Sequence, residues 1–178
     1  DFEESFEPYL FENIRSAFSG REIRYDSLEN RIETLVSSLP DEYREEIESY
    51  ALTMADGEEG YSENGKLSYI EALTMQLIPD ALRPCACSAL SVDGSRTVSG
   101  SRISLRNLEW NLGSSSQMTH ILAVVHMKKK ENSITAISVL GLLYMITAVN
   151  DDGVMIGILD VGTVNGMPYV YEGKKCYT

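Results

Sequence analysis

The sequence is poor in positive charge and contains no long apolar run. Its 178 residues hold 15 Lys and Arg against 27 Asp and Glu, a formal net charge of -12. Such a surface offers no attraction to a phosphate backbone, so nucleic acid is not an expected partner. The longest nearly uncharged stretch, from Ser133 to Asn150, is interrupted by Ser, Thr and Gly and is rich in β-branched residues. This pattern predicts buried strands and no membrane span.

Cysteine and histidine are also scarce. The C-x-C pair Cys85 and Cys87, the distant Cys176 and two histidines, His120 and His126, lack the paired spacing of a metal site, so we expect no metal and no cofactor. We expect both histidines on one strand, sharing a face. Cys85 and Cys176 form a disulfide in an oxidising compartment or are otherwise buried thiols. No secretory or transit peptide is visible at the start of the sequence, which leaves the compartment open, including an extracytoplasmic or secreted location.

Charge and hydrophobic period divide the chain near Cys87. Residues 1–86 hold 20 acidic and 7 basic side chains, whereas residues 87–178 hold 7 acidic and 8 basic ones. The first part has apolar residues at helical spacing, and the second has short runs typical of strands. We therefore predict an acidic helical segment over 1–86 and the first part of a strand-rich domain over 87–178.

Four amphipathic helices are expected in the first part. Pro40 and Asp41 favour the start of one helix, and Ser68 with Glu71 forms a capping box that opens another. Most acidic residues in this part of the chain are expected on helix faces that are exposed to solvent. The expected helical spans are 9–18, 28–39, 41–57 and 68–79, with Gly57 and Pro79 as stops.

The sequence pattern of the second part predicts short strands separated by turns. Asp93-Gly94 and Asp152-Gly153 are tight-turn signals, and the second should join two strands as a hairpin. The expected strand spans are 88–91, 97–99, 103–105, 121–127, 134–139, 144–149, 154–159 and a start at 169–171.

Three spaced motifs in the second part carry a family resemblance. They are Cys87-Ser88, the block Arg106-Asn107-Leu108-Glu109-Trp110, and the segment 141–154, which reads GLLYMITAVNDDGV. In this order they resemble the N-terminal-nucleophile cysteine hydrolases grouped around choloylglycine hydrolase, penicillin acyltransferase and acid ceramidase. The segment 39–57 is similar to the prosegment of the penicillin-acyltransferase-like members, in which a glutamate-bearing helix precedes the nucleophile.

The resemblance implies a self-processing thiol enzyme. Cleavage between Ala86 and Cys87 would place a new α-amino group beside the thiol of the same residue, and an α-amine with an ordinary pKa of about 7.7 to 8.0 can act as a base near neutral pH. The family pattern puts Arg106 beside the thiol, where it favours the thiolate. It gives Glu109 the task, done by Asp in the family, of holding the α-amino group.

Asp160 aligns with an asparagine whose side chain helps to bind the oxyanion in the family. A carboxylate donates a hydrogen bond only when it is protonated. Three interpretations stay open: backbone N–H groups form the oxyanion hole, Asp160 has another role, or the alignment is displaced by one residue.

The resemblance also implies a fold and a substrate class. The family fold is an α+β sandwich of the αββα type, and the 92 residues from Cys87 onward supply only about six or seven strands. We therefore expect an incomplete sandwich, completed by a second chain or a downstream segment, with a homo-oligomer as a further option.

The expected substrate is a small acyl amide with an apolar acyl group, cleaved at a non-peptide C–N bond. Residues 142–145 either line its acyl pocket or are ordinary core residues. The alternative function is a non-catalytic acidic binding or scaffold domain that retains the family's strand pattern.

Overall fold

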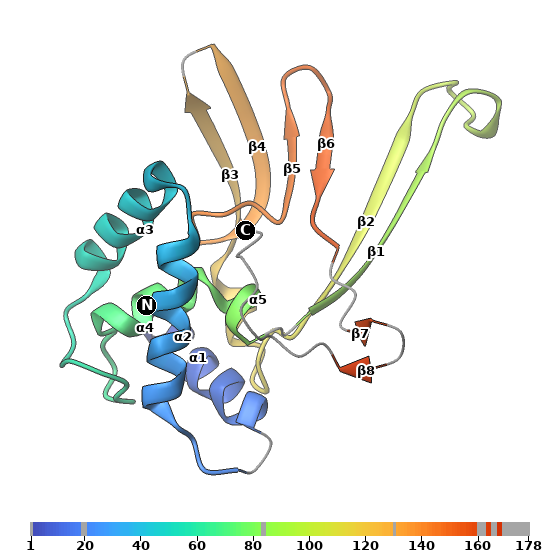
Figure 1. Ribbon diagram of the computed structural model, residues 1–178. Coiled ribbons are helices and arrows are strands. Elements are labelled where there is room, and N and C mark those ends of the chain that lie inside the picture. The colour runs from blue at the N-terminus through green and yellow to red at the C-terminus, as the bar shows by residue number, and fades with distance from the viewer. Residues whose placement is uncertain are drawn as a thin grey trace.

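The protein is a mixed α+β structure. The computed structural model describes residues 2–18, 21–82, 85–129, 131–159, 163–164 and 167–168. Within these ranges the chain forms five α-helices, a two-stranded ribbon and a four-stranded sheet, with one further pair of two-residue strands. The helices come first and gather on one side of the molecule, and the strands follow (Figure 1).

The helices of the structure lie where apolar residues recur at helical spacing in the sequence. Helix α3 (Asp41–Met54) begins at Asp41, as predicted, and in helix α2 (Tyr25–Ser38) the apolar residues at helical spacing form the buried face. Tyr43, by contrast, is 57% exposed although the pattern placed it on the apolar face of α3. The five helices are α1 (Phe2–Phe18), α2 (Tyr25–Ser38), α3 (Asp41–Met54), α4 (Tyr69–Gln76) and α5 (Ile78–Ala81).

The capping box at the start of α4 is confirmed, but the predicted end of this helix is wrong. The Ser68 hydroxyl accepts from the Glu71 backbone N–H, and the Glu71 carboxylate accepts from the Ser68 N–H. Helix α4 ends at Gln76, and Pro79 lies within the first turn of the separate helix α5. Proline is suited to that first turn because its missing N–H would have no helical partner there.

The core joins the two parts of the chain. Its largest fully buried side chains come from α1, among them Tyr9, Phe6 and Phe11. The same cluster includes Met118, Ile121 and other residues that follow the ribbon. Trp110 packs against it and donates a hydrogen bond from Nε1 to the Tyr9 hydroxyl. The helical segment and the strand-rich segment therefore bury apolar surface against each other.

The ribbon consists of β1 (Cys85–Val92) and β2 (Ile103–Trp110), paired antiparallel. The strand predicted at 97–99 is wrong: these residues belong to the loop between β1 and β2, after the short 3-10 helix η1 (Gly94–Arg96). The Thr97 hydroxyl donates to the carbonyls of Gly94 and Ser101, which gives this backbone a local partner in place of a strand.

The larger sheet has the order β3-β4-β5-β6 and follows the 3-10 helix η2 (Gln117–Ile121). The predicted hairpin at Asp152-Gly153 is confirmed, since β5 and β6 pair antiparallel and Gly153 has a positive φ of 76°. The strand predicted from Tyr144 begins only at Thr147. The strands are β3 (Leu122–Lys129), β4 (Asn132–Val139), β5 (Thr147–Asn150) and β6 (Met155–Gly157), and the short pair is β7 (Thr163–Val164) with β8 (Met167–Pro168). The strand start predicted at 169–171 lies outside the described residues.

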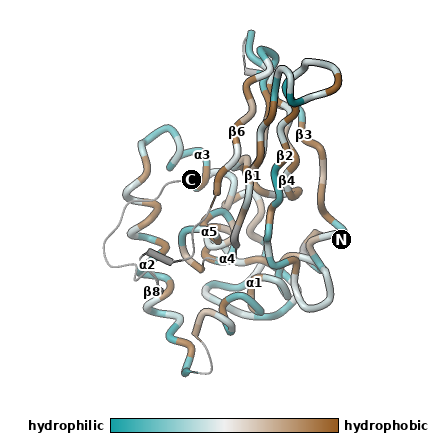
Figure 2. Tube along the Cα trace, turned by 90° about the vertical axis from the view of Figure 1, so that its right-hand side faces the viewer, coloured by the Kyte–Doolittle hydropathy of each residue, from teal (hydrophilic) through white to brown (hydrophobic). Residues whose placement is uncertain are grey.

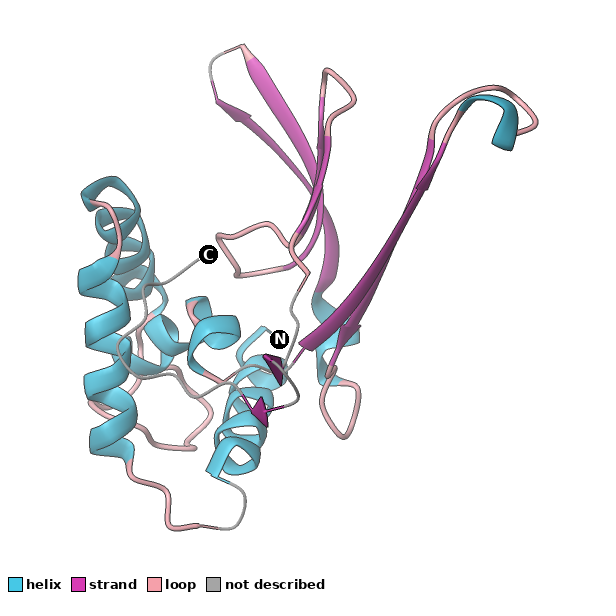
Figure 3. Cartoon of the chain, turned by 45° about the vertical axis from the view of Figure 1, so that its right-hand side comes forward, coloured by secondary structure: helices cyan, strands magenta, loops and turns pink. Residues whose placement is uncertain are grey.

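Both sheets expose apolar side chains. Val124 and Ile137 face each other across β3 and β4, and each is 62% exposed. Figure 2 shows hydrophobic residues along the strands as well as within the helices. The ribbon and the four-stranded sheet are not hydrogen-bonded into one sheet, and they diverge toward the tips of the ribbon and the β5–β6 hairpin (Figure 3).

Candidate active site

The ribbon brings Cys87 and Arg106 together. Cys87 lies opposite Leu108 in the register, and Arg106 lies opposite Ala89. Because side chains alternate along a strand, Cys87 and Arg106 occupy diagonal positions on one face of the ribbon. Arg106 Nη2 donates to Cys87 Sγ over 3.1 Å, and both residues are partly buried. A guanidinium in this position favours the thiolate form of a cysteine.

Arg106 also connects the ribbon to the larger sheet. The same Nη2 atom donates to the backbone carbonyl of Ile158, directly after β6. Arg106 Nε is buried and has no hydrogen-bond partner among the described residues. One guanidinium nitrogen therefore contacts both the Cys87 thiol on β1 and the Ile158 carbonyl after β6, which lies 52 residues beyond Arg106 in the sequence.

Glu109 lies apart from the thiol. It alternates with Leu108, so its side chain belongs to the opposite face of the ribbon from Cys87. The side chain is exposed, and Oε1 accepts from Asn107 Nδ2 over 3.2 Å. In the register Glu109 pairs with Ala86, so it lies opposite the residue that precedes the predicted cleavage site.

The remaining predicted site residues are described only in part. The Ala86–Cys87 peptide bond lies inside β1, but the side chains of Cys85 and Ala86 lie outside the described part of the structure. Asp160 and Cys176 lie outside the described residues altogether.

An open pocket of about 860 Å³ separates α3 from the larger sheet. Leu143, Tyr144 and Met145, three of the four residues predicted to line an apolar pocket or the core, line it, whereas Leu142 packs against the core. The side chain of Ile158 also lines this pocket, while its carbonyl accepts from Arg106. Further apolar walls come from Leu39, Tyr43, Ile47, Met127 and Ile134, and polar groups from Glu46, Gln76, Lys128 and Asn132.

Sequence reasoning missed the α3 wall of this pocket. Tyr43 and Ile47 have the spacing of an ordinary apolar helix face, which does not distinguish a pocket wall from a core contact. Their partners on β3 and β4 lie about 80 residues further along the chain, so no local signal identifies the pocket.

Gln76 holds the loop that forms one side of the pocket. The side chain is fully buried, with Nε2 donating to the Gly141 carbonyl over 2.6 Å and Oε1 accepting from the Leu143 N–H over 2.9 Å. Gln76 thus satisfies two backbone groups of the loop that precedes β5, and β5 itself begins three residues later than the sequence predicted. The helical segment thereby positions the pocket loop of the strand-rich segment.

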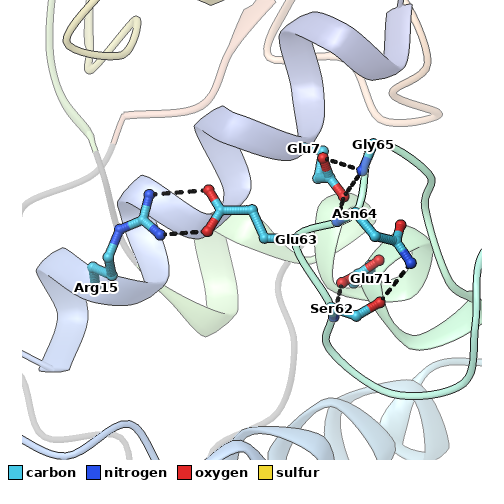
Figure 4. Close-up of polar contacts among 7 residues, drawn as sticks. All are labelled: Glu7, Arg15, Ser62, Glu63, Asn64, Gly65 and Glu71. Atoms are coloured by element: carbon cyan, nitrogen blue, oxygen red, sulfur yellow. Dashed lines mark hydrogen bonds and ion pairs between the residues drawn. The ribbon is translucent and has the colours of Figure 1, made fainter.

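Two buried carboxylates anchor the loop between α3 and α4 (Figure 4). Glu7, from α1, accepts from the backbone N–H groups of Asn64 and Gly65. Glu71, from α4, accepts from the N–H groups of Ser62 and Ser68. Burial raises the pKa of Glu71, and the hydrogen bonds from Ser68 and Ser62 oppose that rise. These two carboxylates have a structural role in the loop, in contrast to the exposed acidic helix faces.

The two histidines lie in different elements of the structure. His126 on β3 shares a 2.9 Å hydrogen bond between Nδ1 and Thr135 Oγ1. The prediction that His120 shares a strand face with it is wrong, because the backbone around His120 turns through η2. Within the described ranges no three His, Cys, Asp or Glu side chains are placed to hold a metal ion.

Across the part of the chain that the structure describes, every helix is too short or too polar to span a bilayer. Comparison of the chain with protein-family models, with curated proteins and with solved structures finds no match.

Proposed function

We propose that the protein is an autoprocessed cysteine amidohydrolase or acyltransferase of the N-terminal-nucleophile type. The contact between Arg106 Nη2 and Cys87 Sγ carries this proposal. The two residues are 19 positions apart, and each comes from a motif on which the family resemblance rests. The adjoining apolar pocket supplies a second element that such an enzyme needs.

Self-processing would begin at the Ala86–Cys87 bond. The thiolate of Cys87 attacks the carbonyl carbon of Ala86, the C–N bond breaks, and the freed α-amine takes up a proton. The resulting thioester between the Ala86 carbonyl and Sγ is then hydrolysed by water, which leaves the Ala86 carboxylate and a free thiol. Cys87 thereby becomes the first residue of a new chain, with nucleophile and base on one residue.

Turnover would repeat the same chemistry on a small-molecule amide. The α-amine of Cys87 accepts the thiol proton, and the thiolate attacks the amide carbonyl to form a tetrahedral intermediate. The leaving amine departs with a proton, and the thioester passes its acyl group to water or to a second amine. The apolar residues of the pocket beyond Ile158 suit the acyl group, and Glu46, Lys128 and Asn132 add polar groups to its lining.

The proposed fold is the αββα sandwich of this enzyme class, in incomplete form. The exposed apolar side chains of the β3–β6 sheet, including Val124 and Ile137, are a suitable surface for a second layer. A second chain or a further segment of the same protein would supply that layer.

One observation favours the alternative of a non-catalytic acidic binding or scaffold domain. The Glu109 side chain lies on the opposite face of the ribbon from Cys87, although the family pattern assigns it to the α-amino group of that cysteine. In a scaffold domain, the contact between Arg106 and Cys87 would only tie the ribbon to β6.

Intact-mass spectrometry of the purified full chain, incubated over a range of pH, tests the processing step. The proposal expects two fragments with the boundary between Ala86 and Cys87. Cys87→Ala should leave the chain whole, while Cys85→Ala, its neighbour two residues away, should still be cleaved. Cleavage in Cys87→Ala together with its loss in Cys85→Ala would show that the wrong nucleophile had been chosen.

Turnover is tested with a panel of amides on processed enzyme. The panel contains N-acyl amino acids, bile acid conjugates, fatty amides and phenylacetyl or phenoxyacetyl amides. We expect product release together with a transient acyl adduct on Cys87, found by rapid acid quench and peptide mass spectrometry. An inert, uncleaved chain would favour the scaffold alternative, and an adduct on another residue would contradict this site.

A further inference from the structure

Gly157, the last residue of β6, lies against the side chain of Arg106. A Cβ atom built on Gly157 would be 2.9 Å from Arg106 Cδ and 3.1 Å from Arg106 Nε. Real Cβ contacts are almost never shorter than 3.0 Å, so a side chain at this position would displace the arginine. The Arg106 side chain can approach the β6 backbone this closely because residue 157 has no side chain.

We infer that Gly157 is a positioning residue, which acts through Arg106 to hold the guanidinium against the thiol of Cys87. This inference rests on the proposed function for its role in catalysis. Arg106 reaches Cys87 Sγ and the Ile158 carbonyl with the single atom Nη2, so a displacement of the side chain disturbs both contacts together. Arg106 Nε, which is buried and has no partner in the described part of the chain, makes neither contact.

The backbone conformation of Gly157 is compatible with alanine, so Gly157→Ala should introduce no backbone strain. The φ of Gly157 is outside the left-handed region, in contrast to Gly153 in the neighbouring turn, so alanine is conformationally acceptable at position 157. Alanine is also no worse than glycine in a strand. The effect of Gly157→Ala should therefore be confined to Arg106 and the groups that Arg106 contacts.

Alkylation of Cys87 by iodoacetamide tests the inference without any substrate. The second-order rate is measured on the full chain at neutral pH by peptide mass spectrometry, with fragment ions that separate Cys87 from Cys85. A guanidinium beside a thiol favours the reactive thiolate, so loss of this contact should slow alkylation, by roughly threefold. We expect this decrease in both Gly157→Ala and Arg106→Ala.

A double-mutant cycle shows whether Gly157 acts through Arg106. In the Arg106→Ala background there is no long side chain to displace, so adding Gly157→Ala should leave the alkylation rate unchanged. Ile156→Ala is the matched control, because Ile156 is 64% exposed and points to the opposite face of β6. This control should react at the rate of the unaltered protein.

Two results would overturn the inference. One is an unchanged rate in Gly157→Ala alone, and the other is an equal decrease whether or not Arg106 is present. Far-ultraviolet circular dichroism of each variant verifies that the fold is retained. The alkylation cycle and the amide panel can fail separately: absence of turnover would contradict the proposed enzyme, whereas an additive cycle would contradict only the role of Gly157.

Discussion

Replacement of Gln76 by methionine should destabilise the protein more than any surface substitution. Methionine has nearly the same length and volume as glutamine, so the change removes the amide while leaving the packing of the α4 side chain almost intact. Gln76 is fully buried, and its amide makes two hydrogen bonds, with the Gly141 carbonyl and the Leu143 N–H. Both bonds are lost together.

The magnitude follows from the two backbone groups that lose their partner. A hydrogen bond contributes about 1 kcal/mol net, and a buried group left without a partner costs about 1 to 3 kcal/mol. Gly141 and Leu143 are partly buried, so some of this penalty is relieved by water. We expect Gln76→Met to reduce the free energy of unfolding by about 2 to 4 kcal/mol, a large share of the ordinary 5 to 15 kcal/mol stability of a domain.

Urea denaturation at pH 7, followed by circular dichroism, measures this difference. Gln76→Glu provides a second test, because a carboxylate still accepts from the Leu143 N–H but faces the Gly141 carbonyl with an oxygen. Protonation restores a donor, so Gln76→Glu should gain stability relative to Gln76→Met as the pH falls. A loss below about 1 kcal/mol in Gln76→Met would refute the reasoning that these two bonds hold the pocket loop.

Three further predictions concern titration, cooperativity and subunit association. Burial raises the pKa of Glu71 above its ordinary value of 4.5, so the folded state binds this proton more tightly than the unfolded chain. The contribution of Glu71 to stability should decrease as the pH rises above 4.5 through the raised pKa, and urea titrations across this range should show that decrease in the unaltered protein but not in Glu71→Gln. Trp110 is the single tryptophan and contacts the shared core, so its fluorescence and the helical circular dichroism signal should report the same urea midpoint; two separate midpoints would contradict a common core. If the chain is cleaved before Cys87, both fragments should elute together in size-exclusion chromatography, because α1 and η2 bury apolar residues in one cluster; free elution of residues 1–86 would contradict this.

The sequence correctly predicted those elements of the fold that depend only on neighbouring residues. The Ser68 and Glu71 capping box is made by residues three positions apart, and the Asp152-Gly153 hairpin needs only a residue that tolerates a positive φ. Where distant groups compete for the backbone, the predictions were wrong. The strand expected from Tyr144 begins only at Thr147, and the loop before it is held by Gln76, which is far away in the sequence.

The candidate site likewise has residues that the sequence singled out and contacts that only the fold decided. Sequence motifs singled out Cys87 and Arg106 as separate residues, but their contact depends on the register of β1 and β2. The same register assigns the Glu109 side chain to the other face of the ribbon. A shift of one residue would reverse these faces, and the motifs alone do not specify the register.

The sequence by itself determined the acidic helical first part, the strand-rich second part and the capping of α4, because hydrophobic period, charge and turn chemistry act over a few neighbouring residues. Only the tertiary structure decided which polar side chains are buried, as for Glu7 and Gln76, and which apolar ones line the pocket beside Ile158. It also decided that Gly157 lies against Arg106. Burial and close approach depend on segments that meet only after folding, and the energy of each contact depends on the partner that the fold provides.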